Sequence, residues 1–504
     1  VPPGGEFAET EIASLSAAMQ AGRLTARRLV EWYLERIASL DRSGPAIRSI
    51  IEVNPEALDV AEALDRERGA SGPRGPLHGI PLLIKDNIDT ADHMQTTAGS
   101  LALLGPLPAR DATVAARLRA AGAVLLGKAN MSEWANFRST HSSSGWSARG
   151  GQALNPYSLD RTPCGSSSGS ASAVAASLAA ASLGTETDGS ILCPASANGV
   201  VGIKPTVGLT SRAGVVPIAH SQDTVGPFGR TVADAALLLG AVAGEDPRDP
   251  ATAQGASRHG DYTRLLDPNA LRGARIGIPR EVYFGYSEKT DAIAATAIET
   301  IKSLGAVIVD PANIPTAKQI DECKTELEVL LYEFHADLDD YLAVRGPEAA
   351  VHNLAELVAF NAAHAEQELP YFGQELFEQA LTKGPLTESA YLAALEENRR
   401  MARQEGIDAV MDEHRLDALL MPTGSPPWKI DLIDGDHGLG GCSQPAALAG
   451  YPAISVPAGY VFGLPVGITF IGRAFSEPKL IALAFAFEQA TKARRPPRFV
   501  PTTA

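Results

Sequence analysis

The sequence has few of the residues that build metal centres or disulfide frameworks. Its four cysteines are Cys164, Cys193, Cys323 and Cys442, and no two form a Cys-x-x-Cys pair. Cysteines this sparse predict neither a disulfide framework nor a zinc knuckle. We therefore interpret Cys164 and Cys193 as small buried hydrophobic residues. The ten histidines contain no His-Glu-x-x-His motif and no close pair, so we expect no metal site.

Long apolar runs and positive charge are also scarce. The longest run without charged residues or glycine lies around residues 171–183 and is rich in alanine and serine. It is shorter than the roughly eighteen apolar residues of a membrane helix. The net charge of −16 disfavours nucleic acid and anionic membrane surfaces as partners. The one basic cluster, residues 492–497, is short, and we interpret it as a solvated tail. We expect a soluble protein with no nucleic-acid or membrane partner.

What the chain does contain is a regular alternation of helical and strand patterns. Leu29, Val30, Tyr33, Leu34 and Ile37 repeat at the spacing of one buried helix face, behind a plausible N-cap at Thr25. The alternation predicts an α/β protein with a mixed central β-sheet covered by helices. Helices are expected in 24–42, 55–69, 113–121, 232–244, 292–304 and 479–493, and strands in 47–53, 79–88, 123–130, 274–279, 306–310, 416–422 and 453–472.

The chain shows no Pro/Gly/Ser linker and no repeat. We therefore predict one large domain over residues 1–504, with a core signature region at about 80–235. The helical stretch at about 317–415 is interpreted as a cap or insertion.

The stretch CGSSSGSASAVAASLAAASLGTETDGSILCP, residues 164–194, places glycine-flanked serines at both ends of a small-residue pattern that we interpret as a helix. One interpretation is a phosphate-binding loop, although the lysine of GxxxxGK[ST] is missing. A second takes Ser167 as the nucleophile of a G-x-S-x-G elbow, although no strand pattern precedes it. A third combines Ser166 and Ser190 with Lys85, which ends the apolar strand GIPLLIK.

These motifs resemble the amidase signature family of serine hydrolases. The family's Gly/Ser loop and G-T-[DE]-x-x-G-S-I turn are present in residues 164–191, and GVVGIKPT at 199–206 follows them as in the family. GKANMSEWAN, HSQDTVGPFGRTVADAA and GLPVGITFIG are similar to further family blocks. The resemblance covers most of the chain and implies the amidase signature fold.

The resemblance implies a catalytic residue set. Ser190 would be the nucleophile, Ser166 a bridging serine held by a cis peptide bond, and Lys85 the base. Backbone N–H groups around Thr187, Asp188 and Gly189 would receive the oxyanion, without metal or cofactor. A lysine acts as a base only when it is neutral, and the apolar residues before Lys85 suggest the burial that lowers its pKa.

Within the family, the chain is most similar to bacterial peptide amidases. It carries Asp188 where many relatives have glycine and Leu192 where many have arginine, which counts against tRNA-dependent amidotransferase subunits. We expect hydrolysis of carboxamides, above all the C-terminal amide of peptides. The alternatives are an amidase of small amides and a partner-dependent amidotransferase subunit. We expect a monomer. The opening VPPGGEF, without methionine, suggests a processed or trimmed product, which leaves export with removal of a signal peptide open.

Overall fold

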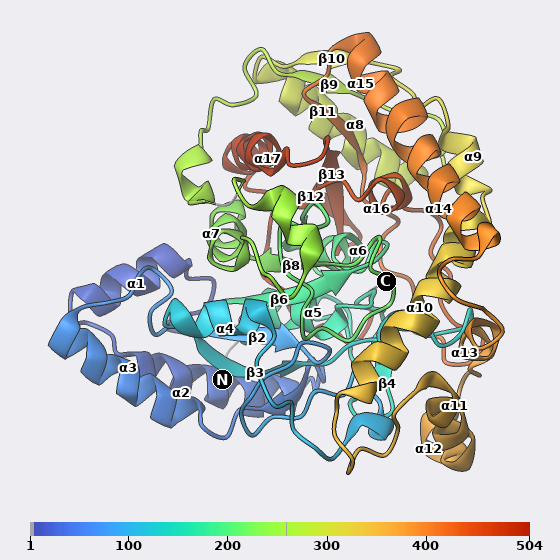
Figure 1. Cartoon of the computed structure of the whole chain (residues 1–504). Coiled ribbons are helices and arrows are strands. Elements are labelled where there is room, and N and C mark those ends of the chain that lie inside the picture. Colours follow the sequence, from blue (N-terminus) through green and yellow to red (C-terminus); the bar gives the residue numbers. More distant parts are fainter. Residues whose placement is uncertain (1–4, 259, 504) are drawn as a thin grey trace.

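One mixed β-sheet organises the chain in the computed structural model, which describes residues 5–258 and 260–503 (Figure 1). Its eleven strands run in the order β1-β3-β2-β6-β8-β7-β12-β13-β11-β9-β10, and β4 and β5 form a separate pair. The strands are β1 Ile50–Val53, β2 Pro81–Lys85, β3 Val124–Ala129, β4 Trp146–Ser147, β5 Gly151–Gln152, β6 Ala181–Glu186, β7 Val201–Lys204, β8 Thr224–Gly229, β9 Arg275–Gly277, β10 Val307–Val309, β11 Ala418–Pro422, β12 Ala453–Val461 and β13 Leu464–Ile471.

The predicted α/β class and mixed sheet are confirmed. β2 pairs in parallel with β3 and β6, whereas β6, β8, β7, β12 and β13 pair antiparallel in succession. The sequence patterns did not predict β7 or β8. Each is short and contains glycine, and β8 also contains proline, so neither shows the usual strand composition.

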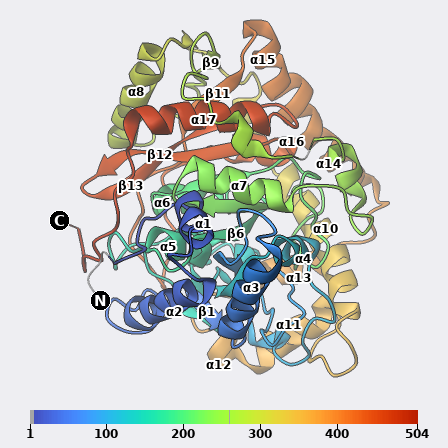
Figure 2. The ribbon, with the colours of Figure 1, turned by 90° about the vertical axis from the view of Figure 1, so that its left-hand side faces the viewer.

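Helices cover both faces of this sheet. α4, α7 and α17 lie on one side, and α5 and α6 lie on the other (Figures 1 and 2). The helices are α1 Ile12–Gln20, α2 Ala26–Arg36, α3 Ala57–Ser71, α4 Thr113–Ala120, α5 Ser168–Ala175, α6 Leu192–Ala197, α7 Val232–Val242, α8 Glu288–Ser303, α9 Ala317–Asp321, α10 Thr325–Ala343, α11 Leu354–Ala363, α12 Ala365–Glu368, α13 Glu375–Ala380, α14 Ser389–Ala402, α15 Asp408–His414, α16 Gln444–Ala449 and α17 Glu477–Thr491. No helix in the described ranges is long and apolar enough to span a membrane.

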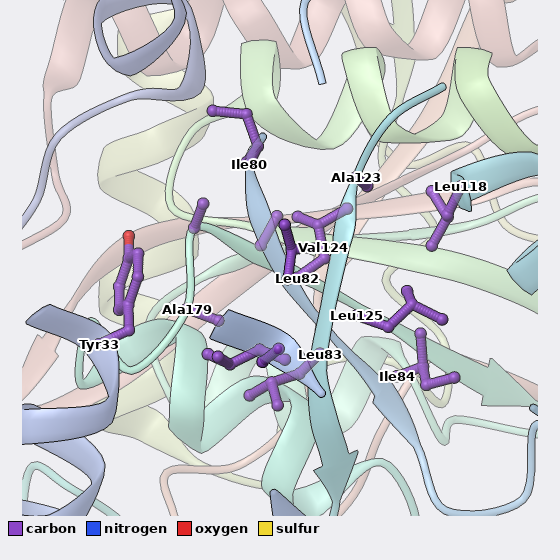
Figure 3. Close-up of a cluster of buried hydrophobic side chains, with 14 of the residues drawn as sticks. Tyr33, Ile80, Leu82, Leu83, Ile84, Leu118, Ala123, Val124, Leu125 and Ala179 are labelled. Carbon is purple, nitrogen blue, oxygen red and sulfur yellow. The ribbon is translucent and has the colours of Figure 1, made fainter. Parts of the chain in front are cut away.

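Local sequence signals explain several of these elements. The hydroxyl of Thr25 accepts a hydrogen bond from Arg28 N (3.1 Å), as predicted for the N-cap of α2. β2 and β3 are buried along their whole length, because helices cover both faces. Leu82, Leu83 and Val124 of these strands meet Tyr33 of α2 in one hydrophobic cluster (Figure 3).

The small-residue stretch contains a helix and a strand, which corrects the prediction of one helix with serines at both ends. α5 ends at Ala175, Ser177 takes a left-handed conformation (φ 54°), and the chain returns as β6. Ser190 therefore follows β6 and does not lie at the end of α5. Alanine and serine suit the helix, and they also suit a central strand that α5 approaches closely.

The segment from α9 to α15 packs beside the sheet and over the loops at one end of it. Leu331, Phe334 and Leu338 of α10 share a hydrophobic cluster with Trp134 and Phe137, which lie in the loop after β3. β11, after this segment, joins the same sheet as β2 and β6. We propose that residues 317–415 form a cap that holds these loops in place.

The close approach of α5 to its neighbours gives a test of packing at Gly169. A Cβ atom there would lie 2.1 Å from Ser49 O and 2.5 Å from Asn130 O. We expect Gly169→Ala to lower the free energy of unfolding by about 2–3 kcal/mol, measured by urea denaturation.

Gly69→Ala is the matched control, because Gly69 also lies in a helix and an added Cβ would meet no atom within 4 Å. It should leave stability unchanged or raise it by up to about 1 kcal/mol. Equal stability of the two variants would contradict the tight packing of α5.

Candidate active site

Lys85 ends β2 inside the protein, as the apolar residues before it predicted. Its side chain is fully buried, and Nζ lies 2.7 Å from Ser166 Oγ and 2.8 Å from Thr185 Oγ1. Burial lowers the pKa of Lys85 to about 7, although the negative charges of Asp223 and Glu186 oppose this shift. A large fraction of Lys85 is therefore neutral near neutral pH.

Asp86 does not hold Lys85 in its charged form. The strand pleat turns its side chain away, and Oδ2 accepts hydrogen bonds from Thr97 Oγ1 and Gly99 N (3.1 Å). Arg149 pairs with the other carboxylate oxygen at 3.4 Å. Lys85 and Asp86 are adjacent in sequence, but their side chains therefore lie in different surroundings and do not pair with each other.

Ser166 lies in the loop that enters α5. The Gly165–Ser166 peptide bond is cis, and Ser166 O accepts a hydrogen bond from Ser132 N (3.1 Å). Ser166 is fully buried. A Cβ at position 165 would lie 2.2 Å from Ser132 Oγ, so a larger residue there would displace that hydroxyl.

Ser190 lies in the turn between β6 and α6 and retains 7% of its accessible surface. Its carbonyl accepts a hydrogen bond from Ser167 N (3.2 Å), which joins this turn to the loop of Ser166. Glu186 holds the far side of the turn, because its Oε2 accepts hydrogen bonds from Ile191 N (2.5 Å) and Leu192 N (2.9 Å).

The turn also provides backbone donors. Within the described ranges, the N–H groups of Asp188, Gly189 and Ser190 make no hydrogen bond. Gly189 has a positive φ of 79°, which glycine adopts without strain. Asp188 retains some exposed surface, and burial of its carboxyl raises its pKa.

Ser167 does not fit the role of an elbow nucleophile. Its Oγ donates a hydrogen bond to Thr185 O (2.9 Å) and accepts one from Thr185 N (3.2 Å), so it ties α5 to β6. Irregular chain precedes it, where a nucleophile elbow requires a strand. The geometry brings Lys85 to Ser166 and not to Ser167.

The interpretation of Cys164 and Cys193 as unlinked buried residues was wrong. They form a disulfide with a Cα–Cα distance of 5.9 Å. One half precedes Ser166 by two residues and the other follows Ser190 by three, so the bond crosslinks the two serine-bearing segments. The sequence carries no motif that predicts a pair separated by 29 positions.

Three residues near the site were not singled out from the sequence. Thr185 contacts Lys85, Glu186 holds the turn after the nucleophile, and Asp223 accepts a hydrogen bond from Thr187 Oγ1 (2.5 Å). Thr185 and Glu186 are the T and [DE] positions of the recognised G-T-[DE]-x-x-G-S-I turn and could have been found from it. Asp223 lies 33 residues beyond Ser190, and only the fold places it beside Thr187.

A cavity of about 190 Å³ adjoins the serine turn. Gly189, Cys193 and Ser443 form one side of it, and the glycine-rich loop near Trp428 and Gly440 forms the other. The cavity therefore reaches Gly189, the neighbour of Ser190 in the turn.

One group of side chains could bring three metal ligands together in the described ranges. His220, Glu333 and Asp337 place ligand atoms within 4.8 Å of one another. His220 Nδ1 already lies 2.8 Å from Asp337 Oδ2, and Tyr391 Oη donates to Glu333 Oε1 at 2.7 Å. These internal pairs account for the cluster without a metal.

Comparisons with known proteins identify the family. The Amidase family model matches residues 28–481. A probable amidase of Arabidopsis thaliana is 46% identical, with 98% of this chain and 92% of the relative covered. A glutamyl-tRNA(Gln) amidotransferase chain of Synechococcus is 37% identical, with 94% and 91% covered.

Solved structures extend the similarity. The native peptide amidase from Stenotrophomonas maltophilia is 53% identical, with a TM-score of 0.93 and coverage of 98% of this chain and 99% of that one. The peptide amidase PAM in complex with the competitive inhibitor chymostatin is 52% identical, with a TM-score of 0.95 and coverage of 98% and 100%. The chain belongs to the amidase family. It is an amidase, a hydrolase acting on linear amide C–N bonds.

The disulfide gives a testable stability contribution. In the chain-entropy model, a crosslink across 29 positions lowers the conformational entropy of the unfolded chain and so raises its free energy by about 3–4 kcal/mol. We expect the Cys164→Ser/Cys193→Ser variant to melt about 3 °C below the parent in calorimetry.

Cys323→Ser is the control, because Cys323 is unlinked and partly exposed. Its melting temperature should stay close to that of the parent. Detection of four free thiols in the unfolded, unreduced parent would show that the crosslink is absent.

Proposed function

We propose that this amidase hydrolyses the C-terminal amide of peptides to a carboxylate and ammonia, with Ser190 as nucleophile, Ser166 as proton shuttle and Lys85 as base. The observation that supports it best is the 2.7 Å contact between the buried Lys85 Nζ and Ser166 Oγ. Such contact lets a neutral lysine accept the Ser166 proton. The loop of Ser166 is in turn bonded to the segment of Ser190.

Acylation then follows from proton transfers between these residues. Neutral Lys85 takes a proton from Ser166, Ser166 takes one from Ser190, and Ser190 Oγ attacks the amide carbon. The proton returns through Ser166 to the leaving nitrogen, the C–N bond breaks, and ammonia leaves. Water hydrolyses the resulting ester by the same transfers, which restores Ser190.

The backbone N–H groups of Asp188, Gly189 and Ser190 would stabilise the tetrahedral intermediate. They make no hydrogen bond within the described ranges, and Glu186 fixes the turn from the other side. Backbone donors fixed before the reaction stabilise developing negative charge without reorganisation. Asp188 in place of glycine leaves its own N–H available.

The peptide substrate is supported by the similarity to peptide amidases over almost the whole chain. A partner-dependent amidotransferase subunit is the second candidate, supported by the 37% identity to the glutamyl-tRNA(Gln) amidotransferase chain of Synechococcus. Because Lys85, Ser166 and Ser190 all come from this chain, we propose that catalysis needs no partner subunit. For the oligomeric state, a monomer stays a prediction.

The substrate assignment is tested by ammonia release from the purified chain. We expect peptide amides to give a higher kcat/KM than free aliphatic amides, and Ser190→Ala to abolish release from both while the fold is retained. Ser167→Ala is the matched control for a neighbouring serine, and it should keep measurable activity. Activity that appears only with added partner subunits would favour the amidotransferase assignment.

The pH dependence tests Lys85. Its neutral form is the active one, so kcat/KM should rise with pH through an apparent pKa near 7 that belongs to the coupled Lys–Ser–Ser unit. Lys85→Ala should lose this ascending limb and most of the rate.

Lys85→Arg keeps the positive charge, but a guanidinium releases no proton in this range. It should be as inactive as the alanine variant. Activity near the parent level in Lys85→Arg would show that position 85 supplies charge and that the base lies elsewhere.

A further inference from the structure

Asp223 precedes β8 and is held by bonds to both carboxylate oxygens. Oδ1 accepts a hydrogen bond from Thr187 Oγ1 (2.5 Å), and Oδ2 accepts from Ile218 N (2.9 Å) and Ala219 N (3.0 Å). Thr187 is the first residue after β6 and begins the turn that carries Ser190. Asp223 therefore fixes the start of the nucleophile turn.

The same carboxylate lies close to the surroundings of Lys85. Thr185 contacts Lys85 Nζ and Thr187 contacts Asp223, and residues two apart on an extended chain project to the same side. Both threonines and Asp223 line one cavity of about 10 Å³, together with Asn87. Lys85 and Asp223 are thus held by neighbouring side chains of one short segment.

Several charged groups surround Lys85 and Asp223. Asp223 is the charge that most opposes the lowered pKa of Lys85, ahead of Glu186. Arg212 faces Asp223 from the loop after β7 and also pairs with Asp249 at 2.5 Å. Asp223 also borders an open groove, where His220 and Asp337 form an ion pair (2.8 Å).

We propose that Asp223 is a positioning residue for amide hydrolysis. It holds Thr187 and so the nucleophile turn, and its negative charge stabilises the protonated form of Lys85. The inference rests on the proposed role of Lys85 as base.

This charge has two opposite effects on the rate. It keeps more of Lys85 protonated at a given pH, which reduces the fraction of active enzyme. It also stabilises the positive charge that forms on Lys85 when the proton arrives from Ser166. Removing it should make the active form available at lower pH and make each active molecule slower.

The experiment measures kcat/KM against pH on one peptide amide for the parent and Asp223→Asn. Asparagine keeps the shape and one acceptor oxygen but removes the charge. We expect the ascending limb to move to lower pH by about one unit and the plateau to fall roughly tenfold. A lower plateau with an unmoved limb would reduce Asp223 to a structural residue and overturn the inference.

Three further variants separate charge from position. Thr187→Val breaks the bond to Asp223 but keeps its carboxyl group, so the plateau should fall while the limb moves less than in Asp223→Asn. Burial raises the pKa of Asp223 to about 6, and Arg212 opposes this shift. Arg212→Gln should therefore leave more of Asp223 protonated and move the limb to lower pH, which tests the charge even where Asp223→Asn does not fold. Asp234→Asn neutralises another buried carboxyl whose pKa is raised to about 6, bonded to Ile12 N, and it should leave the profile unchanged.

The role of Lys85 is tested separately from that of Asp223. A limb that persists in Lys85→Ala overturns both assignments. A limb that disappears in Lys85→Ala, yet stays in place in Asp223→Asn and Arg212→Gln, overturns only the role of Asp223.

Discussion

The burial of Lys85 is the constraint on which the rest of the site depends. Moving its pKa from 10.5 to about 7 corresponds to a free energy on the order of 5 kcal/mol, which the folded protein must supply. It does so by ending β2 beneath neighbouring strands and loops, where the hydrogen-bond partners of Nζ among the described residues are hydroxyl and carbonyl oxygens. The carboxylates of Asp223 and Glu186 raise the pKa of Lys85 through their charge, without a hydrogen bond to Nζ, so the neutral form of the lysine is still populated near neutral pH.

Small residues in α5 and β6 allow these two elements to pack closely around the buried Lys85. α5 lies so close to β6 and the loop after β3 that Gly169 and Gly184 have no room for a Cβ atom. Ser170 and Ser182 satisfy backbone groups between the two elements, at 3.0 Å and 2.9 Å. The Gly/Ser/Ala composition is therefore a packing requirement as well as a source of hydroxyl groups, and it brings the end of β2 to the loop of Ser166.

Much of this could be predicted from the sequence. Helices with one apolar face and long apolar strands carry local periodicity, so the α/β class and the N-cap at Thr25 were evident. The motif spacing and the resemblance singled out Lys85, Ser166 and Ser190, and the structure brings Lys85 to Ser166. The Cys164–Cys193 bond, β7 and β8, and the position of Asp223 depend on contacts between distant segments, which local patterns do not encode. β6 was missed because alanine and serine serve helix and strand alike.

The order of strands in the sheet bears on how the protein is made. β7 lies between β8 and β12, and Lys204 at its end pairs with Ala453. During synthesis β2, β3, β6 and β8 can associate early, but the open edge of β7 stays unpaired until residue 453 has left the ribosome. An exposed strand edge readily pairs with other chains. The strand order therefore leaves an edge open to aggregation for as long as the second half of the chain is missing.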